Sequence, residues 1–295
     1  MLNFENLAKK LNVCGRFMRA VDLSTYKGGG EAFVFLPSNM EEFVKTANFL
    51  RNEQIEFSVL GGGSNMLVND GICKHVFVST RMLNGVQIAN NKVVCECGAK
   101  MANVISQARE HNLGGLEFLC GVPCCVGGAI KMNAGAFSSQ IGDYIYKITV
   151  LSVDNENLLQ YTVSQKNKED IGFSYRNGAK DIVLSAEISL EYMEREHSLK
   201  RGLECLKKRR SKQPNLPSLG SVFKNGESAS AKIIEECGLK GLCHGGAQIS
   251  PMHSNFIVNI GGGTAQDYLY LALLCEQEAQ KQFGVELKRE FVFVD

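Results

Sequence analysis

A chain of 295 residues is long enough for two or three domains with a sizeable core. Its formal net charge of +1 at pH 7 creates no global field that would attract nucleic acid or a membrane surface, so any basic site has to be local. Eleven cysteines without C-x-x-C spacing predict reduced thiols that serve as small apolar side chains, not a zinc site. No secretory leader or membrane-length apolar run stands in the sequence, which predicts a cytoplasmic protein.

The N-terminal region predicts the order strand, helix, strand and glycine loop. Short apolar runs predict the strands at 32–36 and 57–60. The helix between them is expected to begin with a capping box formed by Ser38 and Glu41. After the Gly-Gly-Gly-Ser-Asn loop at 61–65 the chain continues as an extended run, whereas a dinucleotide fingerprint would continue as a helix. The Rossmann interpretation therefore fails, although the loop N–H groups and the Ser64 hydroxyl still suit a phosphate.

The middle of the chain reads as one mixed α+β unit. The expected elements are a hairpin over 86–89 and 93–97, a helix over 101–111, a second hairpin over 145–153 and 158–163, and a strand over 182–190. Together with the preceding region they suggest two domains, over residues 1–75 and 76–196.

The C-terminal third predicts a further domain over residues 197–286, and a final strand over 287–295 that completes the first domain. Expected here are a helix over 197–212 with a basic end, a helix over 229–237, a strand over 256–258, a long helix capped by Thr264 and Asp267, and a strand over 291–294. Pro214 and Pro217 break the chain after the first of these helices.

Glycine and alanine dominate residues 121–142, so neither a helical nor a strand pattern persists there. A loop without bulky side chains presents its N–H groups as a concave donor surface, which suits a pyrophosphate and the polar edge of a flat ring. The alternative is a tight glycine-rich crossing inside a core.

Several motifs, in a fixed order, carry a family resemblance. The loops 61–65 and 121–136 resemble the flavin domain of vanillyl-alcohol-oxidase (PCMH-type) proteins. Phe-Ser-Tyr-Arg at 173–176, Pro-Ser-Leu-Gly-Ser-Val-Phe-Lys-Asn at 217–225, and Met-His-Ser-Asn-Phe-Ile-Val-Asn at 252–259 narrow this further. With Leu-Lys-Arg-Glu at 287–290 they resemble the UDP-N-acetylenolpyruvoylglucosamine reductase family, and the short spacing between Phe173 and Ser221 resembles its shorter second type.

This resemblance implies an α+β fold: a two-part PCMH-type FAD-binding domain and a C-terminal α+β substrate-binding domain. It implies an enzyme of peptidoglycan precursor synthesis that uses FAD and NADPH to convert UDP-N-acetylglucosamine-enolpyruvate into UDP-N-acetylmuramate. We expect a monomer that binds neither nucleic acid nor membrane.

Three residues match the family's catalytic positions, and the chemistry gives each a reason. Hydride delivery to the enolpyruvyl methylene carbon places negative charge on the adjacent carbon and its carboxylate, which Arg176 can stabilise. Ser221 matches the proton donor, and Glu290 matches the residue that stabilises the enol or relays the proton. Without the motifs, these residues read as a surface ion pair, a turn residue and the exposed side of an edge strand.

The resemblance also implies binding residues. The expected cofactor ligands are Gly61, Gly62, Gly63, Ser64, Asn65, Gly121, Pro123, Cys124, Cys125, Gly127, Gly128, Asn133, Ala134 and Gly135. The expected substrate ligands are Tyr175, Lys212, Lys224 and Asn225. The alternative for the basic run 207–212 is a solvated helix end.

The chain departs from the family pattern at a few positions. Cys124 and Cys125 replace a glycine and a hydroxyl residue, which puts the local backbone fit and one hydrogen bond in question. Gly178 stands where serine is usual, and Gly28 replaces a β-branched residue. His253 has no catalytic role that the sequence can derive, and a packed histidine is the simpler interpretation.

Two other functions remain open at this point. An FAD-linked hydroxy-acid or alcohol oxidase on the same scaffold would explain the glycine loops but not the motif 220–225 or Glu290. A non-catalytic nucleotide or nucleic-acid binder could use the basic run, although that run has no interleaved aromatic residues.

Overall fold

A computed structural model describes residues 3–295, which form two compact units, each assembled from separate stretches of sequence. The larger unit comprises the chain up to Arg16, Val34–Gly62 and Val76–Lys208. The smaller unit comprises Phe17–Phe33, Gly63–His75 and Arg209–Asp295. The three-domain division expected from the sequence stays a prediction.

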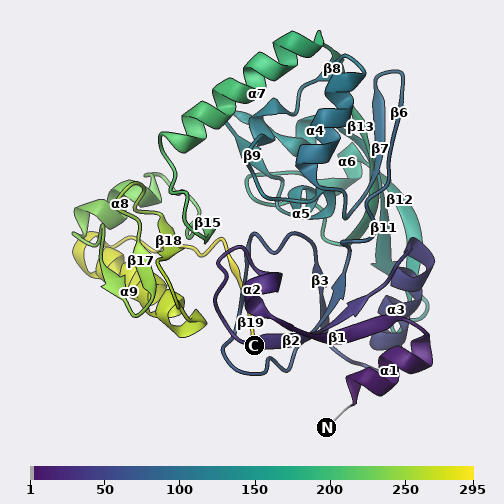
Figure 1. The fold of residues 1–295 in the computed structure, drawn as a ribbon, viewed down its shortest axis with the longest axis horizontal. Coiled ribbons are helices and arrows are strands. Elements are labelled where there is room, and N and C mark those ends of the chain that lie inside the picture. Colours follow the sequence, from purple (N-terminus) through teal and green to yellow (C-terminus); the bar gives the residue numbers. More distant parts are fainter. Residues whose placement is uncertain (1–2) are drawn as a thin grey trace. The chain divides into compact units, whose positions relative to one another are not determined.

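A five-stranded antiparallel sheet forms the centre of the larger unit, in the order β12-β11-β13-β7-β6 (Figure 1). Its strands are β6 (Val86–Ala89), β7 (Lys92–Glu96), β11 (Ile145–Val153), β12 (Tyr161–Asn167) and β13 (Ile182–Ser189). The expected hairpins are present, but β12 begins at Tyr161 instead of residue 158. The Asp154 carboxylate accepts N–H groups of Glu156 and Asn157 at 2.8 and 3.1 Å, so the chain reverses through a wider loop.

Short elements surround this sheet. They are α4 (Met101–Glu110), α5 (Val126–Lys131), α6 (Lys168–Ile171), α7 (Arg195–Arg210), the 3₁₀ turns η1 (Glu117–Leu119) and η2 (Ile141–Asp143), and the strand pairs β8 (Leu113–Gly114) with β14 (Glu191–Tyr192) and β9 (Gly135–Ala136) with β10 (Ser139–Gln140). The expectation of no regular structure over 121–142 was wrong for α5. Its Val126, Ala129 and Ile130 are buried, and this packing outweighs the poor helix propensity of two glycines.

The N-terminal region contains a four-stranded sheet in the order β1-β2-β5-β3. Its elements are α1 (Phe4–Leu11), β1 (Cys14–Arg19), α2 (Ala20–Leu23), β2 (Glu31–Leu36), α3 (Met40–Asn52), β3 (Phe57–Leu60) and β5 (Val76–Ser79). The order strand, helix, strand is confirmed, but the cap of α3 lies one residue later than predicted. Asn39 accepts the Glu42 N–H at 2.9 Å, while Ser38 donates to the Glu42 carboxylate.

The smaller unit pairs a second sheet, in the order β15-β18-β17-β16, with two helices. Its elements are β4 (Met66–Val68), β15 (Ser218–Ser221), α8 (Ser230–Glu236), β16 (Cys243–His244), β17 (Ala247–Ile249), β18 (Phe256–Asn259), α9 (Ala265–Phe283) and β19 (Val292–Val294), and β19 pairs in parallel with β4. The capping box predicted for α9 is confirmed, because Thr264 and Asp267 exchange hydrogen bonds at 3.0 Å. Its buried face contributes to one apolar core.

Candidate active site

Two glycine loops lie against each other in the larger unit. A Cβ atom on Gly61 would stand 2.4 Å from the Cys125 sulfur, and one on Gly62 would stand 3.0 Å from the Pro123 carbonyl oxygen. A Cβ atom on Gly61 would displace the buried Cys125 sulfur, and one on Gly62 would fit only if the Pro123 carbonyl moved by a few tenths of an ångström. Cys125 is 5% exposed and fills the space beside Gly61. The thiol that departs from the family pattern is therefore a packing group between the two loops.

The exposed parts of these loops provide hydrogen-bond donors. Gly62 and Gly128 are exposed, and within residues 3–295 their N–H groups donate to no protein acceptor. Such donors suit a diphosphate, because its oxygens can approach backbone N–H groups where side chains are missing. The residues present therefore fit the diphosphate of FAD. Contacts with the cofactor stay predictions for all of these loop residues: Gly61, Gly62, Gly63, Ser64, Gly121, Pro123, Cys124, Cys125, Gly127, Gly128, Ala134 and Gly135.

Asn133 ties the end of the second glycine-rich stretch to the segment that carries Arg176. Its Nδ2 donates to the Gln140 side-chain oxygen at 2.8 Å and to the Ser174 carbonyl at 3.0 Å, and its Oδ1 accepts the Gly142 N–H at 3.0 Å. Asn133 is 2% exposed and has a φ of 42°, a region that asparagine tolerates better than most residues. Its side chain supports the shape of the site, and its expected flavin contact stays a prediction.

Arg176 lies in a two-residue turn of the larger unit. Ser174 and Asn177 exchange backbone hydrogen bonds at 2.9 and 3.0 Å, with Tyr175 and Arg176 between them. The φ of Arg176 is 54°, in the left-handed region that costs a non-glycine residue about 1–2 kcal/mol. Its Nη1 donates to the Gly135 carbonyl at 3.3 Å. Backbone strain at a cationic residue on an exposed turn is typical of a functional site.

Gly178 holds the end of this turn close to α5. A Cβ atom there would stand 1.7 Å from the Ile130 carbonyl oxygen, and the Gly178 N–H donates to the Lys131 carbonyl at 3.1 Å. The glycine found where serine is usual is therefore required by a close backbone approach in this chain.

Ser221 and Glu290 lie on neighbouring extended segments of the smaller unit. Phe223 and Arg289 form an antiparallel bridge, and the Glu290 N–H donates to the Val222 carbonyl at 2.8 Å. Because Val222 follows Ser221 directly, the structure brings two of the predicted catalytic residues onto adjacent strands. Arg176, the third, belongs to the larger unit.

Asn255 fixes the backbone that follows Ser221. Its Oδ1 accepts the Phe223 N–H at 2.9 Å, its Nδ2 donates to the Phe223 carbonyl at 2.8 Å, and its carbonyl accepts the Val222 N–H at 2.9 Å. Asn255 is 3% exposed, so water does not compete for these bonds. The sequence interpretation missed this role, although an asparagine inside the motif 252–259 was an available signal.

Asn65 joins the first glycine loop to the Glu290 segment within the smaller unit. Its Nδ2 donates to the Glu290 carbonyl at 2.9 Å, and its carbonyl accepts the Val292 N–H at 2.9 Å. The flavin contact expected for Asn65 stays a prediction. In the structure, Asn65 holds the extended segment that carries Glu290.

The expected substrate ligands occupy polar positions in both units. The Asn225 side chain accepts the Ser230 N–H at 3.1 Å, and the Lys224 carbonyl accepts the Ser230 hydroxyl at 2.7 Å, so the loop into α8 is fixed. Lys212 is exposed after the end of α7, and Tyr175 is exposed beside Arg176. Their contacts with a nucleotide substrate stay predictions.

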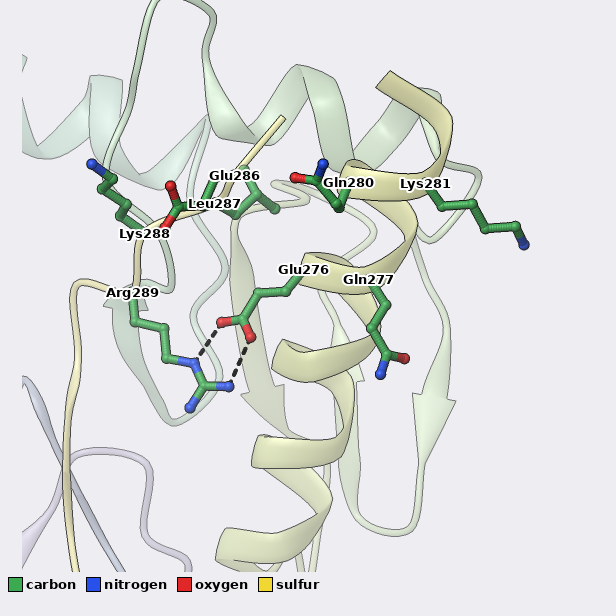
Figure 2. Close-up of a pocket in the computed structure, with 8 residues that line it drawn as sticks. All are labelled: Glu276, Gln277, Gln280, Lys281, Glu286, Leu287, Lys288 and Arg289. Atoms are coloured by element: carbon green, nitrogen blue, oxygen red, sulfur yellow. Dashed lines mark hydrogen bonds and ion pairs between the residues drawn. The ribbon is translucent and has the colours of Figure 1, made fainter. Parts of the chain in front are cut away.

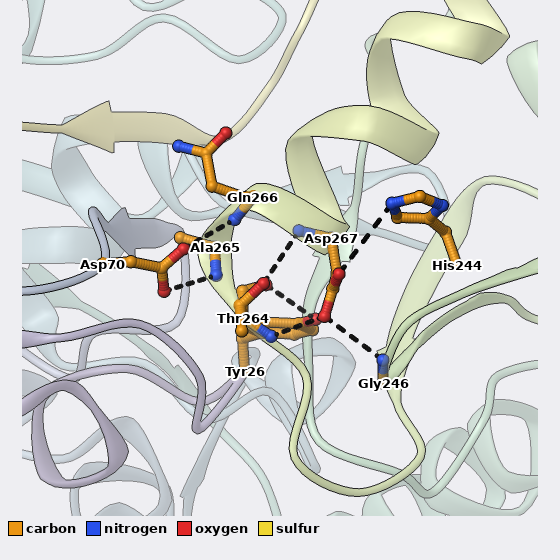
Figure 3. A network of polar contacts seen from close by, with 8 residues as sticks. All are labelled: Tyr26, Asp70, His244, Gly246, Thr264, Ala265, Gln266 and Asp267. Atoms are coloured by element: carbon orange, nitrogen blue, oxygen red, sulfur yellow. Dashed lines mark hydrogen bonds and ion pairs between the residues drawn. The ribbon is translucent and has the colours of Figure 1, made fainter.

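Carboxylates hold the beginning of α9 (Figure 3). Asp70 accepts the first two N–H groups of the helix, both at 3.0 Å. Burial raises the pKa of Asp267, but hydrogen bonds from the Thr264 and Gly246 N–H groups outweigh this effect and hold its pKa below the usual value. Asp267 is therefore ionised at neutral pH and favours the helix N-terminus.

Buried aromatic side chains connect α9 with the Glu290 segment. The Tyr268 ring packs edge-on against both Tyr26 and Phe291, with centroids 5.0 Å apart in each case. The Tyr268 hydroxyl is buried, and among residues 3–295 it has no hydrogen-bond partner. Burial raises the pKa of Tyr268 well above its usual value, so the phenol stays neutral. His253 packs edge-on against Phe256, in agreement with the simpler interpretation of this residue.

The cysteines are free thiols. Burial raises the pKa of Cys95 to about 12, which keeps this thiol neutral. Within the described chain, no group of three or more His, Cys, Asp or Glu residues is placed to hold a metal ion. Over the same residues, no helix combines the length and the apolar character that a membrane span requires.

Comparison with known proteins gives two family matches. Residues 32–159 match the FAD binding domain, and residues 212–294 match the C-terminal domain of UDP-N-acetylenolpyruvoylglucosamine reductase. A UDP-N-acetylenolpyruvoylglucosamine reductase from Listeria innocua serovar 6a is 37% identical over 291 residues, which cover 97% of this chain and 95% of that protein. The chain belongs to the UDP-N-acetylenolpyruvoylglucosamine reductase family.

Solved structures agree with this membership. The family's reductase (MurB) from Thermus caldophilus matches with a TM-score of 0.78 and 29% identity, over 96% of this chain and 100% of that one. Cholesterol oxidase from B. sterolicum matches with a TM-score of 0.50 and 15% identity, over 61% of this chain and 38% of the oxidase. The latter likeness concerns the fold alone, and it agrees with the α+β, PCMH-type FAD-binding architecture expected from the sequence.

Proposed function

We propose that this member of the UDP-N-acetylenolpyruvoylglucosamine reductase family reduces UDP-N-acetylglucosamine-enolpyruvate to UDP-N-acetylmuramate, with FAD as cofactor and NADPH as co-substrate. The family match over nearly the whole chain supports the reaction. The observation that carries the catalytic assignment is the backbone pairing that joins the segments of Ser221 and Glu290. A cytoplasmic location and a monomeric state belong to the same proposal.

Bound FAD would accept a hydride from NADPH and supply one to the enolpyruvyl methylene carbon. The protein then has to stabilise negative charge on the adjacent carbon and the carboxylate. Arg176 offers a planar guanidinium that matches a carboxylate, and its turn is fixed before substrate binds. Such preorganisation favours the transition state over the ground state.

The carbanion-like carbon also has to receive a proton. The Ser221 hydroxyl acts as the donor in this proposal, since a weak acid can protonate a strongly basic carbon when it is held against it. Glu290, on the adjacent strand, stabilises the enol or relays the proton to Ser221. Tyr175, Lys212, Lys224 and Asn225 bind the substrate, with the lysines as point charges for its diphosphate.

Neither alternative is favoured by a specific observation. An oxidase of the same fold would not account for the match of residues 212–294 to this family's C-terminal domain. A nucleic-acid binder would need several aromatic side chains on which bases stack. The Lys208 Nζ lies 5.8 Å from the Phe137 ring centroid, but this single contact is not such a surface.

An anaerobic visible spectrum tests the overall reaction. NADPH should bleach the flavin bands of the purified protein, and UDP-N-acetylglucosamine-enolpyruvate should restore them. Reoxidation by air alone would instead support an oxidase, and a protein that takes up no FAD would contradict the cofactor assignment.

Ser221→Ala tests the proton donor. We expect flavin reduction by NADPH to stay nearly unchanged, while reoxidation by the enolpyruvyl substrate slows by roughly 10²–10⁴-fold, the usual contribution of a positioned acid. Stopped-flow absorbance separates the two half-reactions. Equal losses in both would contradict the role given to Ser221.

A further inference from the structure

The segment that carries Glu290 presents alternate residues to opposite sides. Lys224 N–H donates to the Lys288 carbonyl at 2.8 Å and Glu290 N–H donates to the Val222 carbonyl at 2.8 Å, so residues 288–290 form an extended strand. Side chains alternate along such a strand. Arg289 therefore points to one side, and Glu290 points to the other.

On its own side, Arg289 is held by α9. Its Nε donates to the Glu276 Oε1 at 2.5 Å and its Nη2 donates to the Glu276 Oε2 at 2.9 Å, which is a bidentate pair (Figure 2). A planar guanidinium that meets both carboxylate oxygens has a fixed orientation as well as a fixed distance. These hydrogen bonds raise the pKa of Arg289, so its guanidinium stays charged.

A second contact holds Phe291, the residue that follows Glu290 in the sequence. Phe291 is 6% exposed and packs edge-on against Tyr268 of α9, and the Arg289 guanidinium lies 5.7 Å from the Phe291 ring centroid. Both sequence neighbours of Glu290 are thus tied to the same helix. Its own N–H and carbonyl are tied to Val222 and Asn65.

We propose that the Glu276–Arg289 pair is a positioning device that sets the direction in which Glu290 points. The inference rests on the proposed function, and it assigns Glu276 and Arg289 a role in the proton-transfer step without contact with substrate or flavin. The alternation of side chains carries it: rotation of Arg289 about the strand would turn Glu290 with it.

The surroundings of the pair argue against a purely stabilising role. It borders an open hollow of about 760 Å³ lined by Gln277, Gln280, Lys281 and Glu286 among others, and the Arg289 side chain is 38% exposed. An exposed ion pair typically contributes about 0–1 kcal/mol to the free energy of folding, and a bidentate pair with a half-buried carboxylate, as here, lies at the upper end of that range. Orientation of a reacting group is far more sensitive, because a displacement of about 1 Å can slow a reaction by up to 10²-fold.

Glu276→Gln tests the proposal in the holoenzyme, since it keeps the shape of the side chain and removes its charge. We expect reoxidation of the reduced flavin by UDP-N-acetylglucosamine-enolpyruvate to slow by roughly 5–10-fold, with flavin reduction by NADPH and the urea midpoint nearly unchanged. Arg289→Lys, which cannot form the bidentate pair, should slow the same half-reaction by a smaller factor. The double variant E276R/R289E should recover most of the lost rate.

The matched control is Glu278→Gln. Glu278 lies on the same helix and forms an ion pair with Lys281 at 3.2 Å, so this variant removes an equivalent charge that is not in contact with the Glu290 segment. It should reoxidise like the unaltered protein.

Three results would overturn the inference: equal slowing of both half-reactions in Glu276→Gln, no slowing of reoxidation, or no recovery in the charge-swapped protein. They are distinguishable from failure of the proposed function. In that case the unaltered protein itself would not be reoxidised by the enolpyruvyl substrate.

Discussion

The turn that carries Arg176 and the junction that carries Ser221 and Glu290 are supported in different ways. The turn is closed by its own backbone hydrogen bonds, receives one side-chain hydrogen bond from Asn133 at the Ser174 carbonyl, and has an unfavourable φ at Arg176. The junction depends on backbone pairing between strands, and Asn255 and Asn65 add to it. The cation proposed for the substrate carboxylate is thus placed by a strained turn with local support, while the residues proposed for proton transfer lie on paired strands.

Among the variants that test the support of the two regions, those of Arg176 should have the largest effect on activity, and two of them separate its two roles. Arg176→Gly and Arg176→Ala should each lower kcat/KM by roughly 10²–10³-fold, because the positive charge is lost. Glycine adopts a φ of 54° without strain, so Arg176→Gly should unfold with a free energy about 1 kcal/mol above that of Arg176→Ala. Urea unfolding and steady-state kinetics measure the two effects.

Equal unfolding free energies for the glycine and alanine variants would show that strain at residue 176 does not exceed the entropy cost of glycine, about 0.5–1 kcal/mol. Backbone strain would then no longer distinguish the Arg176 turn from the junction of Ser221 and Glu290.

Asn133 and Asn255 should contribute equally to stability but differently to activity. Asn133→Ala and Asn255→Ala each remove a buried amide and should each lower the free energy of unfolding by about 2–4 kcal/mol. Asn133→Ala should also lower kcat/KM by roughly 30-fold or more, because the turn loses its tether. Asn255→Ala should lower it by about threefold at most, because the pairing of Glu290 with Val222 and the Glu276–Arg289 pair beside it both persist.

Asn177→Ala is the control for the turn. Its Nδ2 donates to the Ser174 hydroxyl at 3.2 Å at an exposed position, so its loss should change the free energy of unfolding by about 0.5 kcal/mol or less. A larger activity loss in Asn255→Ala than in Asn133→Ala, measured where both proteins are folded, would reverse the comparison.

A small effect that depends on pH is expected at the start of α9 in the smaller unit. The pKa of Asp267 is lowered in the folded protein, so its stabilising contribution is complete above the unfolded value of about 4 and disappears as the pH falls through the folded value. Asp267→Asn should therefore be less stable than the unaltered protein by about 1 kcal/mol at pH 7. Denaturant unfolding between pH 7 and 3 should show this difference shrinking below about pH 4. A difference that stays constant down to pH 3 would assign the effect to side-chain shape and not to charge.

Local sequence rules predicted much of the fold and the tip of α9, because a capping box and an apolar face are encoded within a few residues. The candidate catalytic residues were assigned through ordered motifs, not through spacing, and their roles stay predictions. Helix α5 was missed because tertiary packing outweighs the low helix propensity of Gly127 and Gly128. The contacts of Asn133 and the Glu276–Arg289 pair were missed for a related reason. Each depends on a partner that is distant in the sequence and comes close only in the folded chain.

The bond from Asn65 to the Glu290 carbonyl spans 225 positions of the sequence. At about 5–20 residues per second, a ribosome needs on the order of ten to forty seconds to cover that interval. During this time the nascent chain presents β4 without its parallel partner β19, and an unpaired strand edge is a template for wrong pairing. The β4 edge therefore stays unpaired for most of synthesis, and its length of three residues limits the surface that wrong pairing can use.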